Sequence, residues 1–226
     1  FEVKTRRTNN ITMDLKYTYS LANGTGSYAN SSGNVAWTNS DDPRATAPLD
    51  FDQTHKFVGI FDLHYGKNEG PRLGDSYPLQ HLGFNVIFLA ASGLPYTPVQ
   101  ITNEATVGAF APIVTDVRNS RNMPWNLIVD LKLERAFNFG QFKLAPYLWV
   151  KNLLDRDNAI QVWEGSGRPN STGWLETPEG QTFVNAHPTV EDNTGLTGPQ
   201  KYELAQLNPQ NYANPRMVFF GMRAAF

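Results

Sequence analysis

The sequence contains no cysteine, few charged residues and no long apolar run. The absence of cysteine excludes disulfides and thiol chemistry, although it does not identify a compartment. Charged residues make up 18% of the chain and the formal net charge is -2, so no basic surface points to nucleic acid. A transmembrane helix needs about 20 consecutive apolar residues and is therefore excluded. A transmembrane β-barrel is not, because its strands alternate and have a weak hydropathy signal.

The sequence has instead many aromatic residues, at 12%, and several segments of strict alternation. Ile11, Met13, Leu15, Tyr17, Tyr19 and Leu21 alternate with polar residues. In the last eleven residues the apolar register is Val218, Phe220, Met222, Ala224 and Phe226. Such alternation gives a strand one apolar and one polar face. Strands of this length match the 9–11 residues or so that a tilted strand needs to cross a bilayer.

We therefore expect an all-β chain that forms a transmembrane antiparallel up-and-down β-barrel. Its predicted strands lie near residues 1–5, 11–22, 55–65, 82–92, 124–136, 141–153 and 216–226, and its long loops at 23–54, 93–123 and 154–215. We expect a tight turn at Phe137 to Gln141, and a bulge or break at Pro146 because proline lacks a ladder donor. Residues 153–214 show no sustained period. In a meander the three long loops share one end, as the extracellular loops of membrane barrels do.

Five short motifs, in order along the chain, resemble the C-terminal end of a TonB-dependent outer-membrane receptor. Pro124–Phe137 resembles that family's antepenultimate strand, and Val150–Asn158 resembles its V-x-N-L-F-D box, with Leu154 in place of Phe. Pro48–His55 is similar to its D-x-D-Q-R-H motif at the start of a strand. The segments 92–98 and 208–216 are similar to the Oar-like branch, which carries a carboxypeptidase-regulatory-like domain.

This resemblance implies that the chain supplies about seven C-terminal strands of a 22-stranded barrel. The plug domain would lie upstream of residue 1, as would the export signal. The implied location is the outer membrane of a Gram-negative cell, with a periplasmic C-terminus. The implied partners are outer-membrane lipid, the TonB energy-transducing complex, the insertion machinery and a surface lipoprotein. The insertion machinery would recognise Phe226 as an assembly signal.

The sequence contains no motif that predicts catalysis, and we expect neither an enzyme nor a cofactor. The four histidines, at positions 55, 64, 81 and 187, lack the spacing of a zinc site. Asp155–Asn158 lacks the glycine and glutamate of a calcium loop. Trp163, Trp174, Phe183 and Tyr202 occupy the third long loop. Trp163, Trp174 and Tyr202 are candidate ligand contacts, although these aromatic residues would equally suit a small packed loop core.

Two other functions fit the same pattern. A small stand-alone outer-membrane barrel would act as a pore or a structural protein. A secreted all-β carbohydrate-binding module would also have strands with one polar and one apolar face. Alternation alone does not separate a hydrated lumen from the solvent-exposed face of a soluble sheet. Charged residues that fall on the polar registers include Asp14, Lys16, Asp62, Lys132, Glu134, Lys143, Lys151 and Arg223.

Overall fold

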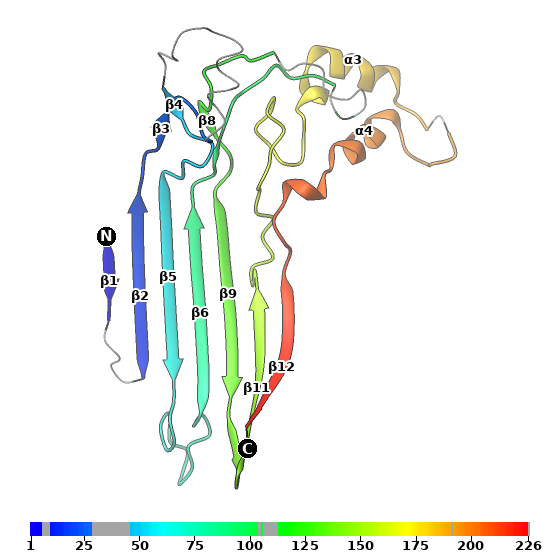
Figure 1. Ribbon diagram of the computed structural model, residues 1–226. Helices are drawn as coiled ribbons and strands as arrows, with labels where there is room; N and C mark the ends of the chain where they lie inside the picture. The colour runs from blue at the N-terminus through cyan, green and yellow to red at the C-terminus, as the bar shows by residue number, and fades with distance from the viewer. Residues whose placement is uncertain (6–9, 29–45, 104, 106–112, 191, 226) are drawn as a thin grey trace.

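A computed structural model describes residues 1–5, 10–28, 46–103, 105, 113–190 and 192–225. One eight-stranded antiparallel sheet forms most of it, with the long loops gathered at one end (Figure 1). The strands are β1 (Glu2–Lys4), β2 (Ile11–Tyr19), β5 (His55–His64), β6 (Leu82–Ala91), β9 (Asn126–Arg135), β10 (Phe137–Phe139), β11 (Phe142–Lys151) and β12 (Met217–Ala225). All of them except β10 lie inside the ranges predicted from alternation.

Neighbours in the sheet follow the order of the chain, as expected for an up-and-down meander. The order is β1-β2-β5-β6-β9-β11, and β12 pairs with the far side of β11. Strand β10 continues the line of β9 and pairs with β11, so the turn expected at 137–141 begins later, at Gly140. Gly140 has a φ of 62°, which favours glycine. Among the described residues, β1 and β12 each pair on one side only.

The two faces of the sheet keep their character from strand to strand. One row of paired residues reads Met13, Phe61, Val86, Leu131, Val150 and Val218. The row beside it, on the other face, reads Thr12, Asp62, Asn85, Lys132, Trp149 and Phe219. Many apolar side chains of the first face are exposed, including Leu15 at 44% and Phe220 at 81%. An exposed apolar face opposite a face that carries charges is the pattern of a barrel wall in lipid.

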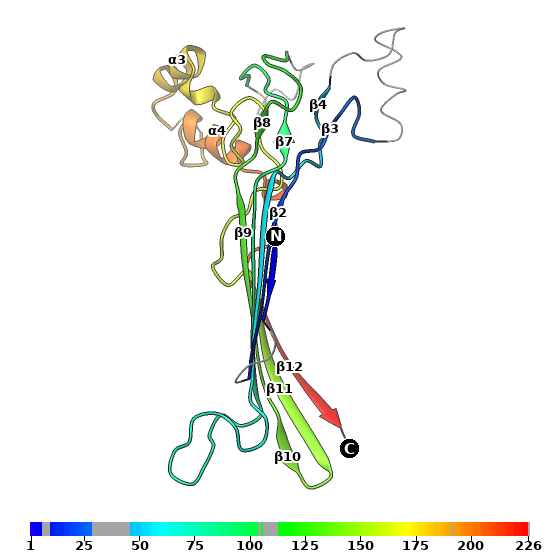
Figure 2. The same cartoon turned by 90° about the vertical axis from the view of Figure 1, so that its left-hand side faces the viewer.

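Pro146 interrupts the pairing on one side of β11 without shifting the register. On the β12 side, the pairs run without a gap from Lys143 to Lys151. On the other side, Leu144 pairs with Phe137 and Tyr147 with Glu134, which is the same register, and the unpaired positions lie between them. The expected bulge is therefore absent and the expected break is present. Figure 2 shows the lower parts of β10, β11 and β12 leaning away from the other strands.

Aromatic side chains collect at two levels of the apolar face. The upper group contains Tyr17, Tyr19, Phe57 and Trp125, where the Tyr17 and Phe57 rings stack at 4.5 Å. The lower group contains Phe137, Phe139 and Phe142. Trp125 and Phe137 are 12 positions apart in the sequence, or about 40 Å along an extended chain. A tilt of about 40° reduces this to roughly 30 Å, the thickness of a bilayer core.

The long loops contain more regular structure than their composition predicts. Strands β3 (Asn23–Gly24) and β4 (Ala47–Pro48) pair in the first loop, and β7 (Pro95–Tyr96) and β8 (Arg121–Asn122) pair in the second. The third loop contains η1 (Trp174–Glu176), α3 (Pro178–Ala186), α4 (Gly198–Gln206) and η2 (Pro209–Asn211). Among the described residues, no helix is long and apolar enough to cross a membrane.

Candidate functional site

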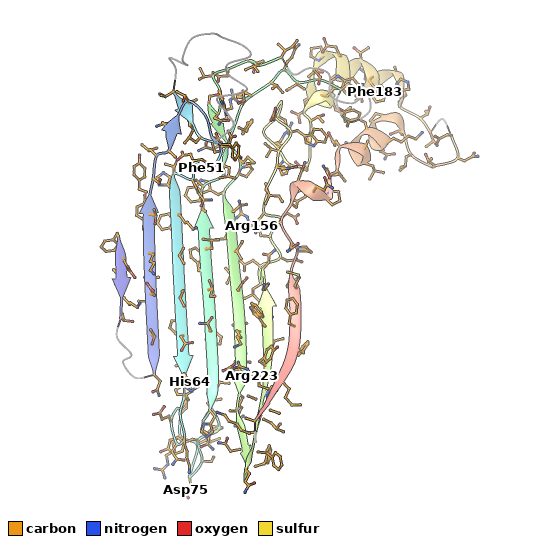
Figure 3. All side chains as sticks on the ribbon, viewed as in Figure 1. Phe51, His64, Asp75, Arg156, Phe183 and Arg223 are labelled. Atoms are coloured by element: carbon orange, nitrogen blue, oxygen red, sulfur yellow. The ribbon has the colours of Figure 1, made fainter. Side chains whose placement is uncertain are left out.

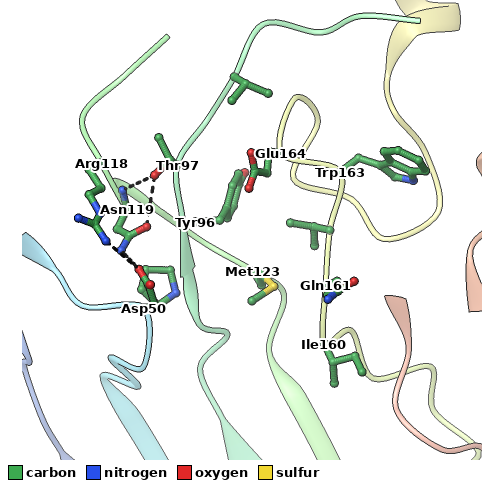
Figure 4. Close-up of a pocket in the computed structure, with 13 residues that line it drawn as sticks. Asp50, Tyr96, Thr97, Arg118, Asn119, Met123, Ile160, Gln161, Trp163 and Glu164 are labelled. Atoms are coloured by element: carbon green, nitrogen blue, oxygen red, sulfur yellow. Dashed lines mark hydrogen bonds and ion pairs between the residues drawn. The ribbon is translucent and has the colours of Figure 1, made fainter. Parts of the chain in front are cut away.

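The three long loops enclose a cavity of about 640 Å³ above the upper end of the sheet (Figure 4). The first loop contributes Asp50 to its lining, the second Tyr96, Thr97, Arg118 and Asn119, and the third Ile160 to Glu164. Because three separate segments build this cavity, its shape depends on the contacts that hold the loops together.

Asn119 joins the first loop to the second. Its side chain is 6% exposed, and its Nδ2 donates to the carbonyl of Pro48 and to Oδ1 of Asp50, both at 2.7 Å. Its backbone N–H donates to Oγ1 of Thr97 at 3.0 Å. Arg118 Nη2 adds an ion pair to Asp50 Oδ1 at 3.6 Å. The buried side-chain amide of Asn119 thus fixes the carboxylate of Asp50 at the wall of the cavity.

Trp163 is hydrogen-bonded to another part of the third loop, and Gly167 lies against the second loop. The indole Nε1 of Trp163 donates to the carbonyl of Gln206 at 3.1 Å, which ties the cavity wall to the end of α4. Gly167 has a φ of 70°, and a Cβ at this position would collide with the hydroxyl of Tyr96. Because Gly167 has no side chain, Tyr96 of the second loop can approach the third loop closely. Trp163 lines the cavity, but its indole ring points away from the other labelled side chains (Figure 4).

Trp174, Phe183 and Tyr202 form a small core in the third loop instead of facing the cavity. The Trp174 ring lies 4.8 Å from that of Tyr202 and 5.4 Å from that of Phe183. Tyr202 is only 2% exposed, and its hydroxyl lies 2.9 Å from Oγ1 of Thr172. Figure 3 shows Phe183 on α3, well away from the sheet. Of the two alternatives for these residues, Trp174 and Tyr202 fit the small packed core. The Tyr202 side chain is not placed to touch a ligand.

The segment that resembles the V-x-N-L-F-D box fastens the third loop to the sheet. Asn152 is 5% exposed with a φ of 50°, and its backbone N–H donates to Oδ1 of Asp130 at 2.9 Å. Its Nδ2 donates to the carbonyls of Arg156 at 3.0 Å and Asn214 at 3.3 Å. Asn158 Oδ1 accepts the N–H of Leu127 at 2.7 Å. The side chains of Asn152 and Asn158 therefore bind backbone groups of the third loop and of the sheet.

Asp155 fastens the start of the last strand. It accepts the backbone N–H of Arg216 at 3.0 Å and pairs with the Arg216 guanidinium at 2.8 Å. The Arg216 N–H and then its positive charge hold the pKa of Asp155 below the ordinary value. Among the described residues, no group of three or more His, Asp or Glu side chains is arranged to hold a metal ion.

Charges on the polar face pair both within strands and between them. Lys16 lies 3.3 Å from both Glu2 and Asp14, and Glu134 pairs with Lys132 at 2.9 Å and with Arg223. His64 and Arg223 lie at similar heights on the sheet (Figure 3) and both line a cavity of about 430 Å³. Balanced charges of this kind suit a hydrated interior.

These features define the class of protein, a membrane β-barrel whose apolar face meets lipid. Residues 1–148, more than half of the chain, match the family described as outer membrane beta barrel domain. The chain belongs to that family, which places it in the outer membrane. No curated protein and no solved structure matches it. Phe226, the predicted assembly signal, lies outside the described residues.

Proposed function

We propose that this chain forms part of the wall of a TonB-dependent transport receptor of the outer membrane. The observation that carries the proposal is that, in the part of the chain that the structure describes, β1 and β12 each leave one edge of the sheet open. In lipid an unpaired strand edge is too costly to persist, so a barrel wall needs a partner at each edge. If further strands pair at these edges, and β1 and β12 do not pair with each other, the barrel is larger than eight strands. Barrels of 22 strands are plugged transporters.

The five motifs that resemble the receptor family support the same proposal. The loop end would face the cell exterior, and cargo would bind at the cavity that Asp50, Asn119 and Trp163 line. The opposite end, with the C-terminal end of β12, would face the periplasm. Energy would come from the TonB complex through a plug domain. The insertion machinery and a surface lipoprotein would be further partners, and the proposal assigns no catalytic residue.

A small stand-alone pore is the second candidate, because it shares the family, the apolar face and the charged interior. A secreted carbohydrate-binding module is less well supported, because soluble proteins rarely expose an apolar surface as large as this sheet face. Detergent dependence separates the module from both barrels. The complete polypeptide should be monodisperse only in detergent or lipid.

Liposome swelling separates the receptor from the pore. The complete polypeptide, reconstituted in liposomes, should not admit a small sugar such as arabinose, because a plug would close it. Capture by the purified C-terminal domain of TonB should also be observed. Rapid swelling without TonB capture would favour the pore and overturn the receptor proposal.

A further inference from the structure

A groove of about 580 Å³ crosses the apolar face of the sheet at the level of Pro146. It runs from β6 over β9 and β11 to β12, or about 14 Å at the usual strand spacing. Its apolar lining consists of Leu82, Leu133, Pro146, Leu148, Phe220 and Met222. All of these residues belong to the register that faces lipid. The groove lies where the pairing of β11 with β9 is interrupted.

One cation at this groove, Arg135, forms no ion pair among the described residues. Arg135 is on the apolar register, opposite Leu82 of β6, and lines the groove. Its Nε is buried and has no hydrogen-bond partner among the described residues. The neighbouring carboxylate, Glu134, also lines the groove, but it belongs to the polar register and pairs with Lys132 and Arg223. An isolated guanidinium nitrogen is costly to bury, so the groove favours an anionic occupant.

The height of Arg135 in the bilayer identifies the source of that anion. The guanidinium carbon lies 5.1 Å from the ring of Phe137, which belongs to the lower aromatic group. Such aromatic groups mark the level of the lipid headgroups in membrane barrels. Phosphate matches the guanidinium fork, and an acyl chain matches the apolar lining.

We propose that this groove binds one anionic glycerophospholipid of the bilayer, with its phosphate on Arg135 and an acyl chain along Pro146 and Phe220. The site depends on the membrane placement described above, although not on transport. The periplasmic leaflet would supply the lipid if the loops face outward. The lipid would fill the groove and satisfy the buried nitrogen.

Native mass spectrometry of the complete polypeptide in mild detergent tests the site, with phosphatidylglycerol or phosphatidylcholine added. We expect the wild type to retain one phosphatidylglycerol and to hold phosphatidylcholine less tightly. Arg135→Gln should weaken phosphatidylglycerol retention about tenfold, because a charge-assisted hydrogen bond is lost. Met222→Trp, which fills the groove, should weaken the retention of both lipids.

Lys143→Gln is the matched control. It removes one cation near the same level, but Lys143 lies on the polar register, so retention should stay at the wild-type value. Equal retention by wild type and Arg135→Gln would overturn the proposal, as would displacement of the lipid by inorganic phosphate alone. A protein that conducts as an open pore but retains the lipid would refute the receptor and leave this site intact.

Discussion

The ring of Tyr147 covers Gly221 across the pair of strands β11 and β12. The two residues are direct partners in the ladder, and a Cβ at position 221 would collide with the Tyr147 ring. Lys132 Nζ and Arg223 Cζ lie 5.7 Å and 5.9 Å from the centre of the same ring. The missing side chain on β12 thus lets one aromatic ring lie flat against the wall between two cations.

Gly221→Ala should destabilise the barrel by about 1–3 kcal/mol, because the added methyl group forces the Tyr147 ring out of position. The measurement is the free energy of unfolding in urea with a lipid bilayer present. The double variant Gly221→Ala/Tyr147→Ala is the control. Its loss should be smaller than the sum of the two single losses, since the collision disappears. Simple additivity would show that the ring does not depend on the glycine.

Asn152→Ala should loosen the third loop. The variant loses the hydrogen bonds to the carbonyls of Arg156 and Asn214 and places alanine at a φ of 50°. We expect a loss of about 2–4 kcal/mol in the local opening free energy of residues 154–215. Hydrogen exchange with mass spectrometry measures this quantity.

Asn152→Gly separates the two contributions. Glycine adopts a positive φ without strain, so this variant should lose only the hydrogen bonds and open less readily than Asn152→Ala. If both variants opened equally, backbone strain at position 152 would have no part in the effect.

Acid should release the contact between Asp155 and Arg216. The folded protein holds the pKa of Asp155 below its ordinary value, so the contact stabilises above the unfolded value of about 4. That stabilisation is lost as the pH falls through the lower folded value. NMR titration of the Asp155 carboxyl carbon in nanodiscs measures the pKa directly.

Arg216→Gln should return this pKa only part of the way. The backbone N–H of residue 216 is the largest cause of the shift and remains in the variant, whereas the charge of the guanidinium is removed. A complete return to the ordinary value would show that the charge alone lowers the pKa.

Tyr202→Phe should weaken the third-loop core by about 1 kcal/mol, because the hydroxyl contact with Thr172 is lost. Tyr202→Ala should cost about 3–5 kcal/mol, since it leaves a cavity among Trp174 and its neighbours. Protease accessibility of α4 reports both changes. Trp163→Phe removes the hydrogen bond to the carbonyl of Gln206, so it should loosen the end of α4 by about 1 kcal/mol.

Alternation predicted the long strands because each of them has two different faces. From Ile11 to Tyr19 the side chains alternate between an apolar and a polar face of the sheet, and the sequence records both. Strand β10 was missed because Gly140 and Gln141 resemble the end of a longer turn. Pro146 predicted the break correctly, but only the structure shows that the register continues past it.

Helices α3 and α4 of the third loop could not be found from periodicity because each has only nine residues and little apolar character. Their starts did carry a signal, since Thr197 and Gln200 form a capping box and Thr177 precedes Pro178. The cavity depends on Asn119, which contacts residues 69 and 71 positions away. No local pattern predicts contacts at that separation.

Helices α3 and α4 extend past β12, beyond the free edge of the sheet (Figure 1). Any strand that pairs with β12 would lie on the side of the sheet toward which these helices project in that view. The loops above that strand would have to share space with them, so their lengths are limited by residues of this chain. A graft of the third loop into another barrel would carry this spatial restriction with it.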